Sequence, residues 1–410
     1  MANSILTPSV IAKESLMQLK NSLVMGNLAH REYKKEFKKV GDTVSIRKPV
    51  KFYTANGATR VNQDVEEGNT SVTIDSRKHV SWSFSTQDLT LSIEEYSERY
   101  IKPAMITLGQ TVDQGGHGLY TNVWNQVGTP GTTPDTYARV SPVAQRLDEM
   151  AVNPMRNLVL NPAARYAIAG DQTGLQNQAM VKTAYKAAEI GQIAGMATYS
   201  SQNVKSHTVG THATGSTPLV NGASQNTTYA LSKTTNTQSL ITDGWANSTA
   251  VLKAGDVFTI AGVYAVNPVP GEGTTGKTAL PYLQQFTVVS DASSDGSGDA
   301  TITIAPAIIT SGPYQTVSAA PADNAAITVQ GTEDTAYPIN LGFNKSAFAL
   351  VTCPLEMPDG VAWKGQESAD GLSVRVVKDY DIDTDEDIIR LDVLYGWKAI
   401  YPDLACRLIG

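Results

Sequence analysis

Residues Gly271 to Thr278 match the phosphate-binding loop pattern G-x-x-x-x-G-K-[ST] in full. Such a loop works because its backbone amides curl around a phosphate and the N-terminus of a following helix faces it. The surroundings argue against that chemistry here. Pro268 and Pro270 precede the loop, and Pro281 stands where the helix would run. We interpret the match as a turn-rich loop and keep a nucleotide hydrolase as a remote alternative.

Carboxylates gather near the C-terminus, at Asp379, Asp381, Asp383, Asp385, Glu386 and Asp387. Their spacing by two is that of calcium-binding loops. Counted from Asp381, however, an EF-hand needs Gly at the sixth place and Glu at the twelfth, where the chain has Glu386 and Asp392. Calcium stays open as an alternative, but a solvated acidic turn or an electrostatic contact with a neighbouring molecule fits the pattern better. We assign no metal and no cofactor.

The remaining reactive side chains show no catalytic spacing. The five histidines are dispersed, and none has a metal-ligand spacing: His30, His79, His117, His207 and His212. Cys353 and Cys406 lie in apolar surroundings outside any C-x-x-C pair, so buried free thiols are expected. The sequence predicts a protein that is not an enzyme.

Charge is distributed unevenly along the 410 residues. The net charge of −7 gives no global reason for nucleic-acid binding, yet residues 1–51 hold ten Lys or Arg against four Asp or Glu. This excess predicts that a basic part of the molecule meets an acidic part, on itself or on a neighbour. The sequence has no run of 18 apolar residues and no signal-peptide pattern, so a cytoplasmic protein without a membrane span is expected.

Two basic segments and one acidic segment are the candidate assembly contacts. Lys34 and Lys35 belong to an N-terminal arm over residues 1–41, and Arg47, Lys48 and Lys51 belong to the base of an extended hairpin over residues 42–84. We predict that the hairpin base or the arm meets the acidic turn, Asp381 to Asp387, of a neighbour. The alternative is that the basic run is simply a solvated face.

A long helix is expected from Ser92 to Gln126. Ser92 and Glu95 form a capping box, and apolar residues then recur at three- and four-residue steps. Pro103 and the pair Gly115 and Gly116 are predicted bend points of this spine helix. The alternative is two ordinary core helices that break at the glycine pair.

The rest of the chain falls into segments that differ in composition and residue pattern. Residues 85–140 contain the spine helix, and residues 141–213 read as the first part of an α/β domain. Residues 214–342 are poor in charge and alternate short apolar runs with Gly- and Asp-rich turns, which predicts an inserted antiparallel β-barrel. Residues 343–410 supply closing strands. The predicted fold class is α+β.

Three stretches, in this order, carry a family resemblance. They are Leu158 to Pro162 (LVLNP) with Ile193 to Ser200 (IAGMATYS), then Lys253 to Val263 (KAGDVFTIAGV), then Leu394 to Pro402 (LYGWKAIYP). With the order of arm, hairpin and spine, they resemble the major capsid proteins of tailed double-stranded DNA bacteriophages. The similarity is greatest to the short-tailed Salmonella phage branch, whose coat protein carries an inserted β-barrel.

The resemblance implies a tailed-phage capsid (Johnson) fold and a structural function. Copies would form hexamers and pentamers of an icosahedral shell, with a scaffolding protein and a portal as partners. Packaged DNA would lie on the inner face, bound without sequence specificity. The protein would reside in the virion after assembly in the host bacterial cytoplasm. The alternatives are a capsid-fold compartment that holds cargo and a phage tail or surface binding module.

Overall fold

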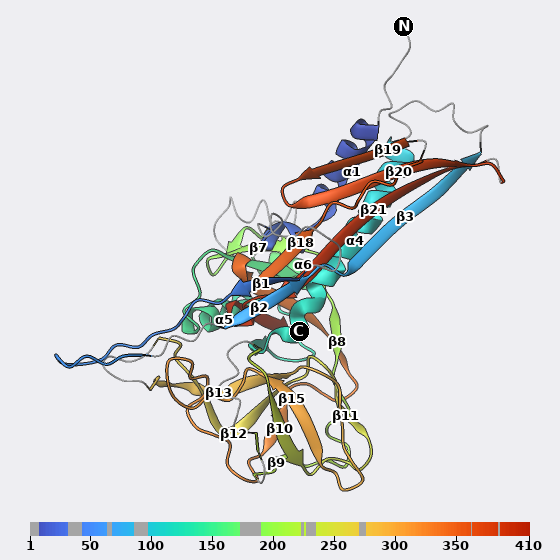
Figure 1. Ribbon diagram of the computed structural model, residues 1–410. Coiled ribbons are helices and arrows are strands. Elements are labelled where there is room, and N and C mark those ends of the chain that lie inside the picture. The colour runs from blue at the N-terminus through green and yellow to red at the C-terminus, as the bar shows by residue number, and fades with distance from the viewer. Residues whose placement is uncertain are drawn as a thin grey trace. The chain divides into compact units, whose positions relative to one another are not determined.

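The computed structural model is shown in Figure 1. The residues that it describes are 8–31, 43–63, 68–85, 97–172, 190–222, 225–226, 235–269, 276–361, 363–383 and 386–410. The chain divides into two compact units. Unit 1 comprises Met1–Ser45, Ser71–His117 and Phe348–Ala399, and unit 2 comprises Ile46–Thr70, Gly118–Ala347 and Ile400–Gly410. Each is described by itself.

Unit 1 contains a five-stranded sheet built around the 14-residue strand β21 (Glu386–Ala399). It pairs antiparallel with β3 (Ser76–Ser85), β18 (Phe348–Thr352) and β20 (Leu372–Asp381), and β20 pairs with β19 (Trp363–Ala369). Alternate apolar residues, such as Leu391 and Val393 of β21, are buried. This period of two is that of a sheet with one face against a core.

Helices α1 (Pro8–Ser22) and α4 (Lys102–His117) pack on each other and on this sheet (Figure 1). Leu19 of α1 and Met105 of α4 are fully buried in one cluster with the sheet residues. A short helix, α2 (Met25–Leu28), follows α1. The prediction of an N-terminal arm therefore needs correction over residues 8–28, because the apolar stripe of α1 belongs to the core of unit 1. Lys34 and Lys35 lie outside the described residues.

The spine helix ends before the predicted Gln126. A π-helical turn (Ser97–Ile101) leads into α4, a 3-10 helix (Gly118–Asn122) follows it, and Gln126 begins strand β4 (Gln126–Gly128). Ser92 and Glu95 of the predicted capping box lie outside the described residues. Pro103 is the second residue of α4, but the π-helical turn runs directly into α4, so its missing N–H removes a backbone donor inside a continuous helical segment. The change from π to α geometry directly precedes it.

Gly115 and Gly116 lie inside α4 and do not break it. An added Cβ at Gly116 would stand 2.7 Å from Cζ2 of Trp397, and one at Gly115 would stand 3.1 Å from Cδ1 of the same ring. The Trp397 indole N–H donates a hydrogen bond to the Val112 carbonyl at 2.8 Å. The glycines therefore let the indole of β21 lie directly on the helix backbone, a packing reason that the sequence pattern did not reveal.

Gly116→Ala is expected to lower the free energy of unfolding of unit 1 by up to about 2 kcal/mol. Alanine gains about 1 kcal/mol of helix propensity over glycine, but overpacking against a rigid ring costs about 1–3 kcal/mol. Gly118→Ala is the control, because nothing lies within 4 Å of its added Cβ. Urea unfolding, with hydrogen exchange of the α4 peptides, measures both. A Gly116→Ala protein as stable as the Gly118→Ala protein would contradict the packing role.

The hairpin consists of β1 (Thr43–Arg47) and β2 (Asn69–Thr73), which form a two-stranded sheet. The Thr43 and Thr73 hydroxyls lie 3.1 Å apart, and the Lys48 amide donates to the Gly68 carbonyl at 2.7 Å. The predicted hairpin also contained the strand around Trp82. That strand is β3, which instead joins β21 over ten paired positions from Ser76 to Ser85. Val80 and Trp82 prefer this site because they pack against the unit 1 core there.

Unit 2 contains a seven-stranded mixed sheet. Its order is β4, β22 (Ala405–Ile409), β17 (Ala336–Asn344), β5 (Arg156–Leu160), β7 (Met196–Ser200) and β6 (Gln192–Ile193), with β8 (Ser206–Thr208) paired to β17. β5 runs parallel to β7, and β22 runs parallel to β4. Helices α5 (Tyr137–Glu149) and α6 (Pro162–Gln172) share a hydrophobic cluster with strand residues of this sheet.

A six-stranded antiparallel sheet forms the rest of unit 2. The order is β16 (Ile327–Val329), β12 (Val257–Val266), β13 (Ala279–Val288), β15 (Ala300–Ala305), β10 (Gln238–Asp243) and β9 (Leu219–Val220). The short pair β11 (Ala250–Leu252) and β14 (Ala292–Ser293) accompanies it. Phe258, Phe286 and Ile302 are fully buried in its cluster. The two edges are bridged, since Leu219 pairs with Ala326 and the Val220 amide donates to the Ala325 carbonyl at 2.9 Å.

The predicted end of the insertion at residue 342 is too late. Strand β17 begins at Ala336 and pairs with β5 and β22, so its residues belong to the seven-stranded sheet. The sequence did not suggest this strand because Pro338 and Gly342 interrupt it. An added Cβ at Gly342 would lie 2.4 Å from Cγ1 of Val143 in α5, so the glycine marks a close approach rather than a turn.

Candidate functional site

The acidic turn lies at the end of the β20–β21 hairpin in unit 1. Asp381 is the last residue of β20, and its carboxylate accepts a hydrogen bond from the Asp383 amide at 3.0 Å. Asp385 and the side chain of Asp387 lie outside the described residues. Between the two aspartates, Ile382 is 83% exposed. The turn therefore presents an apolar side chain flanked by carboxylates, a feature that the sequence analysis did not single out.

The basic hairpin base belongs to unit 2 from Ile46 onward. Arg47 ends β1, and Lys48 and Lys51 follow it. These two lysines line a cavity of about 660 Å³ within unit 2, together with Lys277 of the phosphate-loop-like segment. Phe52 and Val269, 57% and 58% exposed, also line it. The structure thus brings together two basic residues predicted for assembly and a lysine predicted to lie in an unrelated loop.

Lys277 is held by hydrogen bonds within the protein, and its surroundings differ from those of a nucleotide-binding lysine. Its ammonium group donates to the Gln315 carbonyl at 2.9 Å, and its amide donates to the Gln315 side chain at 2.8 Å. Burial, followed by the charge of Lys51, lowers the pKa of Lys277 to about 8. Strand β13 begins at Ala279, where a phosphate-binding loop requires a helix. Residues 270–275 lie outside the described part of the chain.

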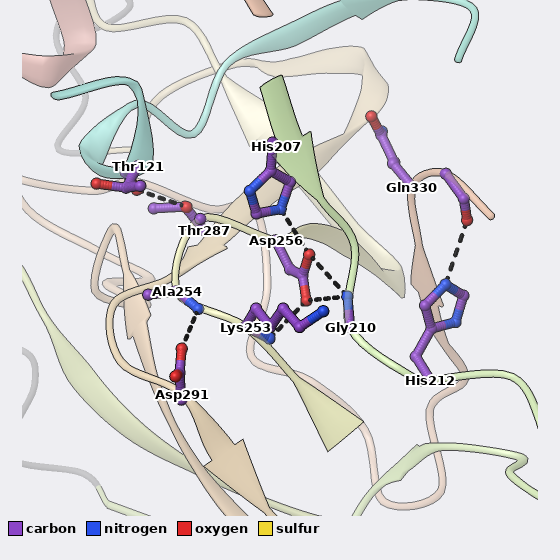
Figure 2. Close-up of polar contacts among 12 residues, drawn as sticks. Thr121, His207, Gly210, His212, Lys253, Ala254, Asp256, Thr287, Asp291 and Gln330 are labelled. Atoms are coloured by element: carbon purple, nitrogen blue, oxygen red, sulfur yellow. Dashed lines mark hydrogen bonds and ion pairs between the residues drawn. The ribbon is translucent and has the colours of Figure 1, made fainter. Parts of the chain in front are cut away.

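A buried polar network joins four segments of unit 2 around His207 (Figure 2). His207 Nε2 lies 2.7 Å from Asp256 Oδ1, and His207 Nδ1 lies 3.1 Å from the Tyr120 hydroxyl. Asp256 also accepts hydrogen bonds from the amides of Gly210 and Lys253, at 3.1 and 2.7 Å. Figure 2 shows His207 and these amides converging on the one carboxylate.

Arg407 of β22 completes this network. It is fully buried, lies 5.4 Å from the Tyr120 ring centroid, and donates to the Gly255 carbonyl at 2.6 Å and the Thr287 hydroxyl at 3.0 Å. Burial raises the pKa of the Tyr120 hydroxyl, so it is a poor nucleophile at neutral pH. The tyrosine–histidine–aspartate arrangement holds the strands and the loop before β12 together.

The sequence did not identify this network. His207 was taken as one of five dispersed histidines, and Lys253 to Asp256 only as part of a stretch that carries the family resemblance. The pairing of His207 with Asp256 spans 49 residues, and Arg407 comes from the last strand. Local spacing carries no signal for partners so far apart.

Unit 1 has an ionic cluster of its own around Asp392 of β21. The carboxylate is completely buried and accepts hydrogen bonds from Arg375 at 2.6 Å, Arg390 at 2.9 Å and Arg77 at 3.2 Å. Burial raises its pKa, but the hydrogen bonds from Arg375 and Arg390 outweigh burial and hold the pKa below its usual value. Asp392 stands at the twelfth position of the EF-hand pattern counted from Asp381, where a calcium-binding Glu is required. Because its carboxylate is buried and bonded to arginines, it does not serve as that calcium ligand.

Among the residues that the structure describes, no group of three or more His, Cys, Asp or Glu side chains is placed to hold a metal ion. Within the same residues, no helix has the length and apolar character to cross a membrane. Cys353 and Cys406 are free and buried, as the sequence predicted.

Comparison with known proteins places these features in a family. The profile described as "P22 coat protein – gene protein 5" matches residues 1–410. The chain belongs to the P22 coat protein family. The predicted function is confirmed by this match: the chain is a major capsid protein of a phage shell. Membership in a structural coat protein family indicates a role without catalysis.

Individual relatives are distant. The major capsid protein of Acyrthosiphon pisum secondary endosymbiont phage 1 is 24% identical over 346 residues, which cover 81% of this chain and 78% of the relative. A solved chain of Mycobacterium phage Che8 is 12% identical, with 94% of this chain and 90% of the other covered and a TM-score of 0.47. A chain of the mature capsid of bacteriophage PhiM1 is 11% identical, with 89% and 81% covered and a TM-score of 0.41.

Proposed function

We propose that this coat protein assembles as hexamers and pentamers into an icosahedral shell around a double-stranded DNA genome. Assembly takes place in the host bacterial cytoplasm, around a scaffolding protein and with a portal, and the product is the virion capsid. The observation that carries the proposal is the family match over residues 1–410. The net charge of −7 is consistent with DNA that is enclosed without sequence specificity.

Within this proposal, the two sheets of unit 2 have separate roles. The seven-stranded sheet with α5 and α6 is the axial domain of the tailed-phage capsid fold. The six-stranded sheet is the inserted β-barrel, and the bridge between Leu219 and Ala326 supports its closure. The insertion then ends before β17, near Asp334, and α4 is the main part of the spine helix. We keep Pro103 as the bend point of the spine, because a π-helical turn precedes it.

Expression with the cognate scaffolding protein tests the proposal. Negative-stain microscopy is expected to show closed shells of uniform size that contain both hexamers and pentamers. Particles that form without scaffold and hold a cargo protein would favour a protein compartment instead. A small soluble oligomer that binds a glycan or another receptor would favour a tail or surface module. Either result would overturn the proposal.

The hairpin base and the acidic turn are the proposed charge contact between neighbours. Reversal of charge at Asp383 and Asp385 to lysine is expected to raise the critical concentration for assembly about tenfold, because lost attraction and new repulsion recur at every subunit. The monomer should stay folded. Sedimentation measures the particles, and circular dichroism measures the fold.

Two matched variants sharpen this test. Asp359→Lys reverses a fully exposed aspartate of the same unit outside the acidic turn, and it should assemble normally. Lys48→Glu with Lys51→Glu, added to the acidic-turn variant, should restore assembly in part. Normal shells from the acidic-turn variant alone would remove this contact from the proposal.

A further inference from the structure

The cavity at the hairpin base and the tip of the β20–β21 hairpin are complementary in two ways. Of the described residues that line the cavity, three are lysines and one is an aspartate, whereas the tip carries carboxylates. Phe52 and Val269 leave more than half of their surface exposed at the cavity. Ile382 leaves 83% of its surface exposed at the tip. Both surfaces therefore combine exposed apolar groups with opposite charge.

We propose that the Ile382 side chain of one coat subunit inserts into this cavity of a second subunit, with Asp381 and Asp383 facing the cavity lysines. This inference rests on the proposed function and deepens it, because it names an apolar anchor within the charge contact. The contact joins unlike surfaces. Head-to-tail contacts of that kind generate rings and extended lattices rather than isolated dimers.

The size and lining of the cavity fit this occupant. A volume of about 660 Å³ accommodates an isoleucine side chain. The apolar lining gives the isoleucine a gain on burial, whereas a small polar anion would gain nothing from Phe52, Val266 or Val269. Apolar anchors in pockets, rimmed by polar groups, supply much of the energy of protein interfaces.

The charges at the cavity favour a carboxylate rather than a further cation. The pKa of Lys277 is lowered first by burial and then by Lys51, which means that the two ammonium groups already repel each other. Carboxylates placed beside them offset this repulsion. Among the described residues that line the cavity, Asp403 is the one carboxylate beside three lysines, so added carboxylates complement the lining.

The proposed Ile382 anchor predicts an effect that a contact between charges alone does not predict. Ile382→Ser keeps every charge of the turn, and it is expected to raise the critical concentration for assembly about tenfold, since a side chain of this size loses its burial. That effect should persist at high salt, where contacts between exposed charges are screened. Ile388→Ser is the matched control, because Ile388 is a second exposed isoleucine of the same hairpin, 38% exposed, outside the turn.

Cysteine trapping between two different variants tests the contact directly. One protein carries Ile382→Cys and the other carries Phe52→Cys, and the two are assembled together with scaffold under mild oxidation. Cys353 and Cys406 are buried and do not compete. A disulfide-linked dimer on a non-reducing gel is expected from this mixture, and much less from Ile388→Cys mixed with Phe52→Cys.

The outcomes separate this inference from the proposed function. Wild-type shells with no crosslink from the Ile382→Cys and Phe52→Cys mixture, and normal assembly of Ile382→Ser, would overturn the anchor and leave the shell function intact. A link that forms only within a single chain carrying both cysteines, and not in the mixture, would also overturn it. Failure of the wild-type protein to form shells would instead overturn the proposed function.

Discussion

Replacement of Arg407 by methionine is expected to lower the free energy of unfolding of unit 2 by about 3–5 kcal/mol. Methionine keeps most of the volume but removes the donors to the carbonyls of Gly255 and Thr121, which lie at 2.6 and 3.2 Å. It also removes the positive charge that stabilises the buried Asp256. Burial lowers the pKa of Arg407 to about 9, so the guanidinium is charged at neutral pH and its loss leaves Asp256 less compensated.

The measurement is hydrogen exchange of the peptides that contain β8, the turn before β12, and β22, with the urea midpoint as a second readout. Arg139→Met is the control in the same unit. Its ion pair with Asp135 spans 2.7 Å, but both side chains are about half exposed, so its loss should cost less than about 1 kcal/mol. Equal effects of the two substitutions would show that the buried network does not stabilise unit 2.

Alternation and turn chemistry predicted many of the strands. The sequence predicted antiparallel strands within residues 214–342 and closing strands within residues 343–410, and the structure has β10, β12 and β15 in the first segment and β20 in the second. These segments follow a period of two between Gly- and Asp-rich turns. In such segments the local pattern and the tertiary packing require the same conformation, so the sequence suffices.

The sequence failed where glycine and proline act through tertiary contacts. Residues 336–342 were assigned to the inserted barrel, yet Pro338 and Gly342 lie inside β17, a strand that pairs with β5 and β22. Gly115 and Gly116 were taken as bends, yet they admit Trp397. In both cases the reason for glycine is a side chain distant in the chain, Val143 or Trp397. Local propensity cannot anticipate that contact.

The assembly site was predicted only in part. The excess of lysine near the hairpin and of aspartate near the C-terminus was evident from the charges alone. Ile382 carried no signal, because one isoleucine between aspartates looks like any turn residue until its exposure is known. The cavity likewise depends on folding, which brings Lys277 to Lys48 and Lys51 across more than two hundred residues.

The two buried ionic groups suggest how a shell subunit keeps its shape before it has neighbours. The Asp392 carboxylate accepts hydrogen bonds from three arginines, one each on β3, β20 and β21. The Arg407 guanidinium on β22 donates hydrogen bonds to the loop before β12 and to β13. Each crosses strands that come from distant parts of the chain. Both groups therefore hold their strands together with bonds that lie within one chain.

Asp392→Asn is the second large effect that we expect. Asparagine fills the same space but leaves the charges of Arg375 and its neighbours without a counter-ion, and Arg375 is only 11% exposed. A loss of about 3 kcal/mol in the free energy of unfolding of unit 1 follows. Asp359→Asn, at a fully exposed aspartate 3.1 Å from Lys364, should leave the urea midpoint unchanged.

The way in which pH changes this stabilisation follows from the direction of the pKa shift of Asp392. Because the pKa of Asp392 is lower in the folded protein than its usual value of 3.8, its stabilisation is complete above that value and is lost as the pH falls through the folded pKa. The wild-type unit 1 should therefore lose stability as the pH falls below about 4, as followed by hydrogen exchange of the β20 and β21 peptides. The Asp392→Asn protein should start lower and lose less over that range. A parallel loss in both proteins would contradict the role of the carboxylate as the centre of the arginine cluster.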